Sequence, residues 1–319
     1  MTSRTARRSL GRDASVAAMA RTRRPDLPRL GARLDALREE WRGRRLDSDP
    51  LVFPHRYTDP GDREVVAFLS ASLAFGRVAS IRTSVERLLA ALGPSPATFL
   101  ESWDERPLPE LKHFVHRWVT GVDIEDFLRI VKRARRAHGS LGALFAGGDT
   151  GGSDFVAPLS TFHGSLHSFS ARPSAPSRGL RFLLPSPEGQ SACKRAHLFL
   201  RWMVREDDMD LGLWTGGRFS PARLLLPMDT HVHRISRYLG LTSRPTADLA
   251  AAREATSWLS LLSPLDPVGY DWALSRLGIL AECVRERTRR HCERCALSPV
   301  CRERIGPLPT KGLERVLTA

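Results

Sequence analysis

Apolar residues recur along most of this chain at the three- and four-residue spacing that places them on one face of an α-helix. In the first such stretch, Leu30, Leu34, Leu37 and Trp41 share a face. The same spacing predicts further helices over 65–73, 78–92, 108–119, 124–138, 194–205, 229–241, 251–262 and from 266 to 283. No stretch alternates apolar and polar residues as a half-buried strand does. The sequence therefore predicts an all-α fold.

Shifts in composition predict the domain organisation. The expected segments are a disordered basic arm at 1–28, a helix-bearing segment at 29–59 that packs with the C-terminal domain, a helical barrel at 60–225 and a C-terminal domain at 226–319. Within the barrel, Gly, Ser and Pro concentrate at 147–187. That composition predicts a flexible connection, interrupted by one helix near 155–169.

One short predicted helix carries a candidate for chemistry at its start. Val232, Ile235 and Leu239 form its apolar face, Gly240 supplies a stop, and Asp229 stands at the N-cap position. The positive end of the helix dipole favours the ionised form of such a carboxylate. Asp229 is therefore a candidate catalytic residue, and a simple cap is the alternative interpretation.

A second candidate lies in a helix that is apolar around most of its circumference, which is typical of a buried helix. A turn rich in Pro and Gly leads into this helix, and Lys194 lies in its first turn. The helix dipole disfavours a cation there, which is one route to a lowered pKa. Lys194 is thus a candidate nucleophile, and a surface lysine is the alternative.

Four of the five cysteines fall within a short segment near the C-terminus, with the spacing C-x8-C-x2-C-x5-C: Cys283, Cys292, Cys295 and Cys301. Four thiolates in a compact loop can bind zinc or a [4Fe–4S] cluster. Zinc ribbons usually supply two C-x2-C pairs, and this segment has one. We therefore expect an iron–sulfur cluster with a structural or DNA-docking role, and zinc remains the alternative.

The net charge of +14 indicates a polyanionic partner. The excess is carried mainly by arginine, whose planar fork pairs with phosphate, so nucleic acid ranks above a membrane surface. An arginine-rich proteome is the alternative explanation, since the surplus is spread along the chain. No apolar run approaches the ~18 residues of a membrane span. We expect a cytoplasmic protein that does not bind membranes.

Taken in order, these parts resemble the helix-hairpin-helix DNA glycosylase superfamily, the endonuclease III group. The shared order is a turn, the Lys194 helix, the Asp229 helix and the cysteine loop. Four phrases more closely resemble an uncharacterised bacterial family known as DUF2400: Leu184-Pro185-Ser186-Pro187, Cys193-Lys194-Arg195, Arg201-Trp202-Met203-Val204-Arg205 and Asp229-Thr230-His231-Val232-His233-Arg234. The wide gap between Lys194 and Asp229 is similar to that in archaeal 8-oxoguanine DNA glycosylases.

The hairpin before Lys194 departs from the endonuclease III pattern. In that pattern two glycines bracket one residue just before the catalytic lysine. Gly189 could match the first glycine, but Ser191 stands at the second. A strict alignment places Cys193, rather than Lys194, at the catalytic position.

The resemblance implies a two-domain, monomeric DNA repair glycosylase that removes a damaged base, an oxidised purine being the first expectation, from double-stranded DNA. Lys194 would form a Schiff base and give lyase activity, with Asp229 assisting. If Lys194 does not reach the sugar of the damaged nucleotide, a water activated by Asp229 would act instead. The expected phosphate contacts are Gly189, Ser191, Arg195, Arg290 and Arg294.

Other interpretations remain open at this stage. Trp214 is a candidate for stacking on a flipped base, but aromatic residues in such contexts more often belong to the core. A non-catalytic iron–sulfur protein that binds nucleic acid on a glycosylase scaffold is the alternative function. The departure at the glycine hairpin favours that alternative, whereas Lys194 and Asp229 favour the enzyme.

Overall fold

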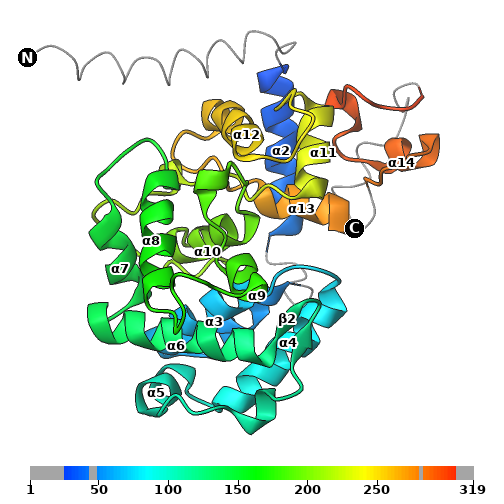
Figure 1. The fold of residues 1–319 in the computed structure, drawn as a ribbon. Helices are drawn as coiled ribbons and strands as arrows, with labels where there is room; N and C mark the ends of the chain where they lie inside the picture. The colour runs from blue at the N-terminus through cyan, green and yellow to red at the C-terminus, as the bar shows by residue number, and fades with distance from the viewer. Residues whose placement is uncertain (1–24, 43–48, 280–282, 307–319) are drawn as a thin grey trace, which may run out of the picture. The chain divides into compact units, whose positions relative to one another are not determined.

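The computed structural model describes residues 25–42, 49–279 and 283–306 (Figure 1). They are mostly helical, with one two-stranded sheet among them, so the predicted all-α class is confirmed. They form two compact units, one of residues 25–42 with 225–306 and the other of residues 49–224. None of the helices described combines the length and the apolar character that crossing a bilayer requires.

The first unit joins the start of the described chain to its end. Its elements are α2 (Leu27–Trp41), α11 (Thr230–Leu239), α12 (Leu249–Leu262), α13 (Asp271–Ile279), α14 (Arg289–Arg294) and a 3-10 turn at Ser298–Val300. α2 packs against α12 and α13 and buries its apolar face. Tyr270 Oη also donates a 3.0 Å hydrogen bond to Asp35 of α2. The first 24 residues of the predicted basic arm lie outside the described residues, and α2 already begins at Leu27.

The second unit is continuous in sequence. Its elements are α3 (Pro60–Ser72), α4 (Val78–Leu92), α5 (Pro96–Ser102), β1 (Val115–His116), β2 (Val119–Thr120), α6 (Gly121–His138), α7 (Leu141–Gly148), α8 (Val156–Ser168), α9 (Arg178–Leu183) and α10 (Lys194–Val204). α10 packs along α3. Phe68 of α3 is central to the core, with ring centroids 4.9 Å from Phe199, 5.3 Å from Phe127 and 6.0 Å from Phe162.

The boundary of the predicted N-terminal segment is wrong at its far end. Residues 49–59 belong to the second unit, where two 3-10 turns, Pro50–Val52 and Pro54–Arg56, pack against α3. Leu51 and Phe53 are fully buried there. Their apolar side chains therefore fix this segment within the second unit.

The helix predicted over 108–119 is also wrong. The chain forms a 3-10 turn at Pro109–Leu111 and then the antiparallel β1–β2 hairpin, in which Val115 pairs with Thr120 and His116 with Val119. β-Branched residues favour strands because of their restricted side-chain rotamers. Arg117 has φ +57°, which a helix does not allow.

The segment 147–187 is more ordered than its composition predicts. The helix expected near 155–169 is confirmed as α8, and α9 is an additional helix. α9 begins where the Ser177 hydroxyl donates to the Asp123 carboxylate. A Cβ at Gly179 would lie 2.3 Å from that carboxylate, so only glycine permits this approach. The fixed position of α9 depends on a contact that composition does not reveal.

One buried carboxylate connects four segments of the second unit. Glu64 of α3 is 5% exposed and accepts hydrogen bonds from the Leu141 and Gly142 amides at the start of α7. Its Oε2 also lies 3.2 Å from the Arg135 guanidinium of α6, and Trp214 Nε1 donates to its Oε1 at 2.9 Å. Removing this charge leaves several buried donors without an acceptor.

We expect Glu64→Gln to lower the free energy of unfolding by about 2 kcal/mol, because a neutral amide cannot satisfy both Arg135 and the α7 amides. The measurement is urea unfolding followed by circular dichroism. Glu101→Gln is the matched control, since Glu101 also pairs with Arg135 but its side chain is 68% exposed, and its loss should stay below about 1 kcal/mol. Equal losses in the two variants would contradict the role of Glu64.

Candidate functional site

Asp229 is the N-cap of α11, as the sequence predicts. Its Oδ1 accepts hydrogen bonds from the amides of His231 (2.8 Å) and Val232 (2.9 Å). Its side chain is half-buried, and no hydrogen bond to Oδ2 is formed within the described residues. Gly240 ends the helix with φ +76°. One carboxylate oxygen is thus fixed by the helix, and the other remains available.

The two histidines that follow Asp229 have different environments. His233 is buried, and its Nε2 donates to the Arg244 carbonyl at 3.0 Å. Burial lowers the pKa of His233, which favours its neutral form. His231 is half-buried and lies against Gly278. A Cβ added at Gly278 would lie 2.5 Å from the Cβ of His231. His233 therefore has a structural role in the loop after α11.

Lys194 is the first residue of α10, in the second unit. It is half-buried, and its ammonium makes no hydrogen bond or ion pair within the described part of the chain. The residue before it, Cys193, has φ +39°, and Gln190 has φ +59°. Two residues other than glycine in the left-handed region within one short loop are uncommon. This backbone positions Lys194 at the start of the helix.

The loop that leads to Lys194 is anchored from two sides. His163 Nδ1 donates to the Pro185 carbonyl, and His167 Nε2 donates to the Leu184 carbonyl at 2.9 Å. The Cys193 thiol also donates to the Pro185 carbonyl, with a distance of 3.6 Å from sulfur to oxygen. Burial raises the pKa of Cys193, which favours its neutral thiol. This is the residue that a strict alignment with the endonuclease III pattern places at the catalytic position.

The prediction that Arg195 contacts phosphate is corrected by the structure. One guanidinium nitrogen donates to the Ser72 carbonyl at 2.6 Å, and the other donates to the Phe182 carbonyl. The guanidinium also stacks over the rings of Phe75 and Phe182, 4.8 and 4.1 Å from their centroids. Burial lowers its pKa to about 10. Arg195 therefore joins α10 to its neighbours inside the unit, whereas Gly189 and Ser191 are exposed.

Trp214 lies in the core, which is the interpretation that the sequence favoured over stacking on a flipped base. It is 5% exposed, and its indole nitrogen is committed to Glu64. Its ring lies 5.2 to 5.4 Å from the rings of Phe145, Phe199 and Phe219. No face of the indole is left for a base.

The four C-terminal cysteines line one cavity in the first unit, with a volume of about 20 Å³: Cys283, Cys292, Cys295 and Cys301. Burial raises the pKa of Cys295 to about 12, and the other three thiols add to that effect. Burial also raises the pKa of Cys283 and Cys301. The four thiols thus line one space. As they are placed, no group of three or more His, Cys, Asp or Glu side chains among the described residues could hold a metal ion.

The segment between these cysteines is basic on its surface. Arg290 and Arg294 of α14 are exposed and form no ion pair within the described residues, whereas Arg289 pairs with Glu293 at 2.6 Å. Two guanidinium groups are therefore available to an anionic partner. Their contact with DNA stays a prediction.

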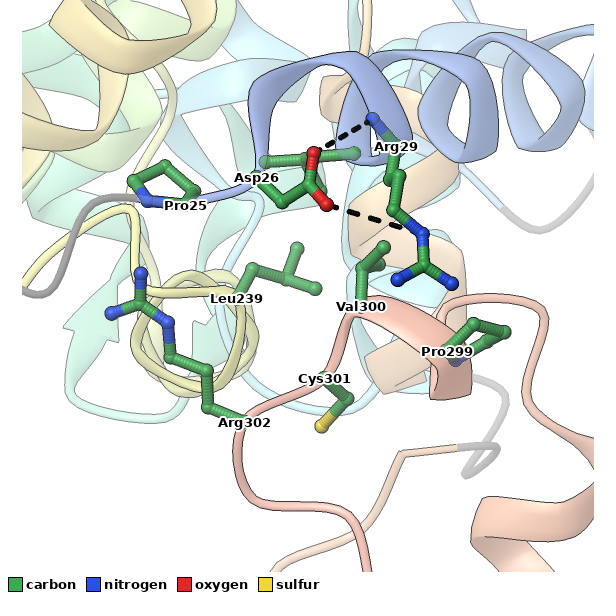
Figure 2. Close-up of a pocket in the computed structure, with 9 residues that line it drawn as sticks. Pro25, Asp26, Arg29, Leu239, Pro299, Val300, Cys301 and Arg302 are labelled. Carbon is green, nitrogen blue, oxygen red and sulfur yellow. Dashed lines mark hydrogen bonds and ion pairs between the residues drawn. The ribbon is translucent and has the colours of Figure 1, made fainter. Parts of the chain in front are cut away.

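A larger cavity of about 190 Å³ lies next to the cysteine segment in the first unit (Figure 2). Asp26 and Arg29 at the start of α2 form an ion pair on its wall, with 3.9 Å between Oδ2 and Nε. Arg302 and Cys301 line it from the C-terminal segment, and Cys301 also lines the smaller cavity. In Figure 2 the Cys301 sulfur points away from Asp26 and Arg29. The cysteine segment is therefore packed against α2.

Comparison with known proteins assigns the chain to a family. A family model described as "Protein of unknown function (DUF2400)" matches residues 49–280. The chain belongs to this family. The DUF2400 match includes Lys194 and Asp229 and ends before Cys283, so it does not extend to the four cysteines. No curated protein and no solved structure matches the chain significantly.

Sequence reasoning overlooked Trp118, which lies in the β1–β2 hairpin and is one of the few exposed large apolar residues described. The segment was interpreted as a helix from its apolar spacing. A signal was available, because Val115, Trp118, Val119 and Thr120 are residue types enriched in strands and Gly121 follows them.

The anchored loop should make the stability of the protein pH-dependent. Burial lowers the pKa of His163 from 6.5 to about 4, so the unfolded chain binds more protons than the folded chain between these values. The free energy of unfolding should therefore fall as the pH falls through this window, by on the order of 2 kcal/mol between pH 7 and pH 5. Urea unfolding at the two pH values measures this loss.

His163→Asn keeps a donor for Pro185 without a titrating ring, so the fall should be smaller in this variant. The exposed His113→Asn is the matched control. An undiminished fall in His163→Asn would assign the pH dependence to other groups.

Proposed function

We propose that this DUF2400 protein is a DNA base-excision repair glycosylase that acts on a damaged base in double-stranded DNA. The proposal rests on the hydrogen bonding of the Asp229 carboxylate. Two α11 amides fix one oxygen, and the other has no partner among the described residues. A carboxylate held in this way suits the stabilisation of positive charge that develops at C1′ of the sugar as the base leaves.

The proposed reaction breaks the bond between C1′ and the base nitrogen, and the base leaves with the bonding electron pair and takes up a proton. In the first route, the neutral amine of Lys194 attacks C1′. The C1′–O4′ bond then breaks, O4′ takes one proton from the nitrogen, and the nitrogen keeps the other in a protonated Schiff base. Removal of a C2′ proton then expels the 3′ phosphate and nicks the strand. In the second route, Asp229 takes a proton from a water that attacks C1′, and no strand is cut. Either route needs the nucleotide to leave the base stack.

The donor set of the cysteine cavity fits a thiolate-bound group. Four thiols around one cavity can bind zinc or a [4Fe–4S] cluster. The spacing favours the cluster, because the segment has one C-x2-C pair and a zinc ribbon usually has two. Cys283, Cys292, Cys295 and Cys301 would hold it, and with four protein ligands it would stabilise the segment that presents Arg290 and Arg294.

A non-catalytic protein that binds nucleic acid is the second candidate. Cys193, which a strict alignment places at the catalytic position, favours this second candidate because its thiol is buried, hydrogen-bonded and neutral. Lys194 is the adjacent residue that could supply an amine. Activity measurements on variants at Asp229 and Lys194 separate the two candidates.

Asp229→Asn should reduce base release by roughly 100-fold or more and leave the fold intact. Asparagine still caps a helix but cannot stabilise a positive charge or accept a proton. The substrates are duplex oligonucleotides that contain 8-oxoguanine, uracil, thymine glycol or an abasic site. Asp248→Asn is the matched control, because Asp248 caps α12 in the same unit, and it should retain activity.

The same substrates decide between the two routes when borohydride is added. A covalent adduct that is lost in both Lys194→Ala and Lys194→Arg indicates a Schiff base, since arginine keeps the charge but forms no imine. Base release without an adduct indicates the water route. DNA binding without base release from any substrate would refute the glycosylase and favour the non-catalytic candidate.

Protein purified without oxygen should contain iron and sulfide and show the broad visible absorbance of an iron–sulfur cluster. Cys295→Ser should lose this absorbance because it removes one of the four thiols around the cavity. Cys193→Ser is the matched control, since Cys193 lies in the other unit and should leave the absorbance unchanged. A colourless protein with one zinc ion per chain would contradict the cluster.

A further inference from the structure

Trp118 is the exposed tryptophan of this protein. Its exposed fraction is 37%, whereas the other six tryptophans are each at most 8% exposed: Trp41, Trp103, Trp202, Trp214, Trp258 and Trp272. It occupies the second position of the two-residue loop between β1 and β2. Val115 and Val122, close to it in the chain, are 59% and 65% exposed. An apolar surface of this kind, in a protein with a net charge of +14, indicates an interaction site.

Two phenylalanine rings pack against the indole of Trp118. The Trp118 ring lies 4.7 Å from the Phe182 ring of α9 and 5.6 Å from the Phe75 ring, and β2 packs against α9 in the same unit (Figure 1). The Arg195 guanidinium lies over these same two phenylalanines. These contacts therefore hold the indole of Trp118 in one position.

Two arginines flank the indole. The guanidinium groups of Arg117 and Arg178 lie 5.1 and 5.8 Å from the Trp118 ring centroid. Both side chains are exposed, and neither forms a hydrogen bond or an ion pair with the described residues. Residues 112–120 and α9 contain no acidic residue. The positive charge beside Trp118 is thus not neutralised by neighbours in these two segments.

The hairpin is built to hold its loop in one conformation. His116 is buried, and its Nε2 donates to the Phe75 carbonyl at 2.9 Å while its Nδ1 accepts from the Ser84 hydroxyl at 2.8 Å. Burial lowers the pKa of His116, which keeps the ring in the neutral form that this pair of bonds requires. Arg117 adopts φ +57°, a left-handed conformation that is unfavourable for a residue with a Cβ. Such strain persists where the surroundings enforce it, and it clusters at functional sites.

We propose that this surface binds an unpaired base of DNA: Trp118 stacks on the base, and Arg117 and Arg178 contact the phosphates on either side of it. A rigid exposed indole supplies stacking that tolerates any base, and unpaired guanidinium groups supply the backbone contacts. The inference rests on the proposed function for the identity of the polyanion as DNA. It adds a base-binding residue in place of Trp214.

Intrinsic fluorescence tests this proposal directly because Trp118 is the exposed tryptophan. The full-length protein is titrated with a duplex that carries one bulged, unpaired base and with the fully paired duplex. The bulged duplex should quench the red-shifted part of the emission, and Trp118→Phe should abolish that change. In a filter-binding assay, Trp118→Ala should weaken binding of the bulged duplex about tenfold or more relative to the paired duplex, whereas Trp118→Phe should retain most of the preference.

The arginines are tested with variants that respect the backbone. Arg117→Asn is compatible with a positive φ, and Arg178→Gln keeps the length of the side chain. Each should weaken binding to both duplexes and reduce its salt dependence. Arg106→Gln is the matched control, since the Arg106 side chain is 85% exposed in the same unit and pairs with Asp104.

Base release measured on the same variants separates this inference from the proposed function. Binding that depends on Trp118 without base release would support the inference and refute the glycosylase. Base release with unchanged binding in Trp118→Ala would overturn the inference and leave the glycosylase standing. Quenching by anionic vesicles but not by either duplex would overturn it in favour of a membrane surface.

Discussion

The second unit depends on a carboxylate that is almost completely removed from water. Burying a charge is unfavourable unless partners replace the lost hydration, and Glu64 has two backbone amides, a guanidinium and an indole as partners. These partners come from segments far apart in the sequence, so the carboxylate selects one arrangement of α3, α6 and α7. The core rings around Phe68 then pack within a frame that is already defined. α10 packs along α3, and His163 and His167 of α8 anchor the loop before Lys194.

Carboxylates at helix starts recur in both units, and they show how one side chain can serve structure and chemistry together. Asp59, Asp229 and Asp248 each accept amide hydrogen bonds at the start of a helix. Asp248 also pairs with Arg244, and this pairing helps to lower its pKa to about 2. Asp229, unlike Asp248, forms no ion pair with a basic residue among the described residues. The proposed catalytic role uses that difference.

Local patterns in the sequence were sufficient for the parts of the structure that local forces decide. The helix expected at 78–92 has those bounds, and the cap and stop of α11 are at Asp229 and Gly240. The clustering of the four thiols also follows from short spacing along the chain. Local patterns could not predict the contacts of Trp214 and Arg195, because their partners, Glu64 and the Ser72 carbonyl, lie 150 and 123 residues away. Trp118 was missed because the apolar spacing of 108–119 predicts a helix, and the left-handed conformation of Arg117 that forms the loop does not show in that spacing.

The order of the units along the chain has a consequence for synthesis. The second unit is continuous, so all of its partners have been made once α10 and the loop after it have left the ribosome. α2 is made first, but the helices that cover its apolar face, α12 and α13, are made near the end. During translation Leu30, Leu34, Leu37 and Trp41 therefore lack the partners that cover them in the folded chain until α12 and α13 have been made. The first unit is the last to fold although it contains the earliest helix described.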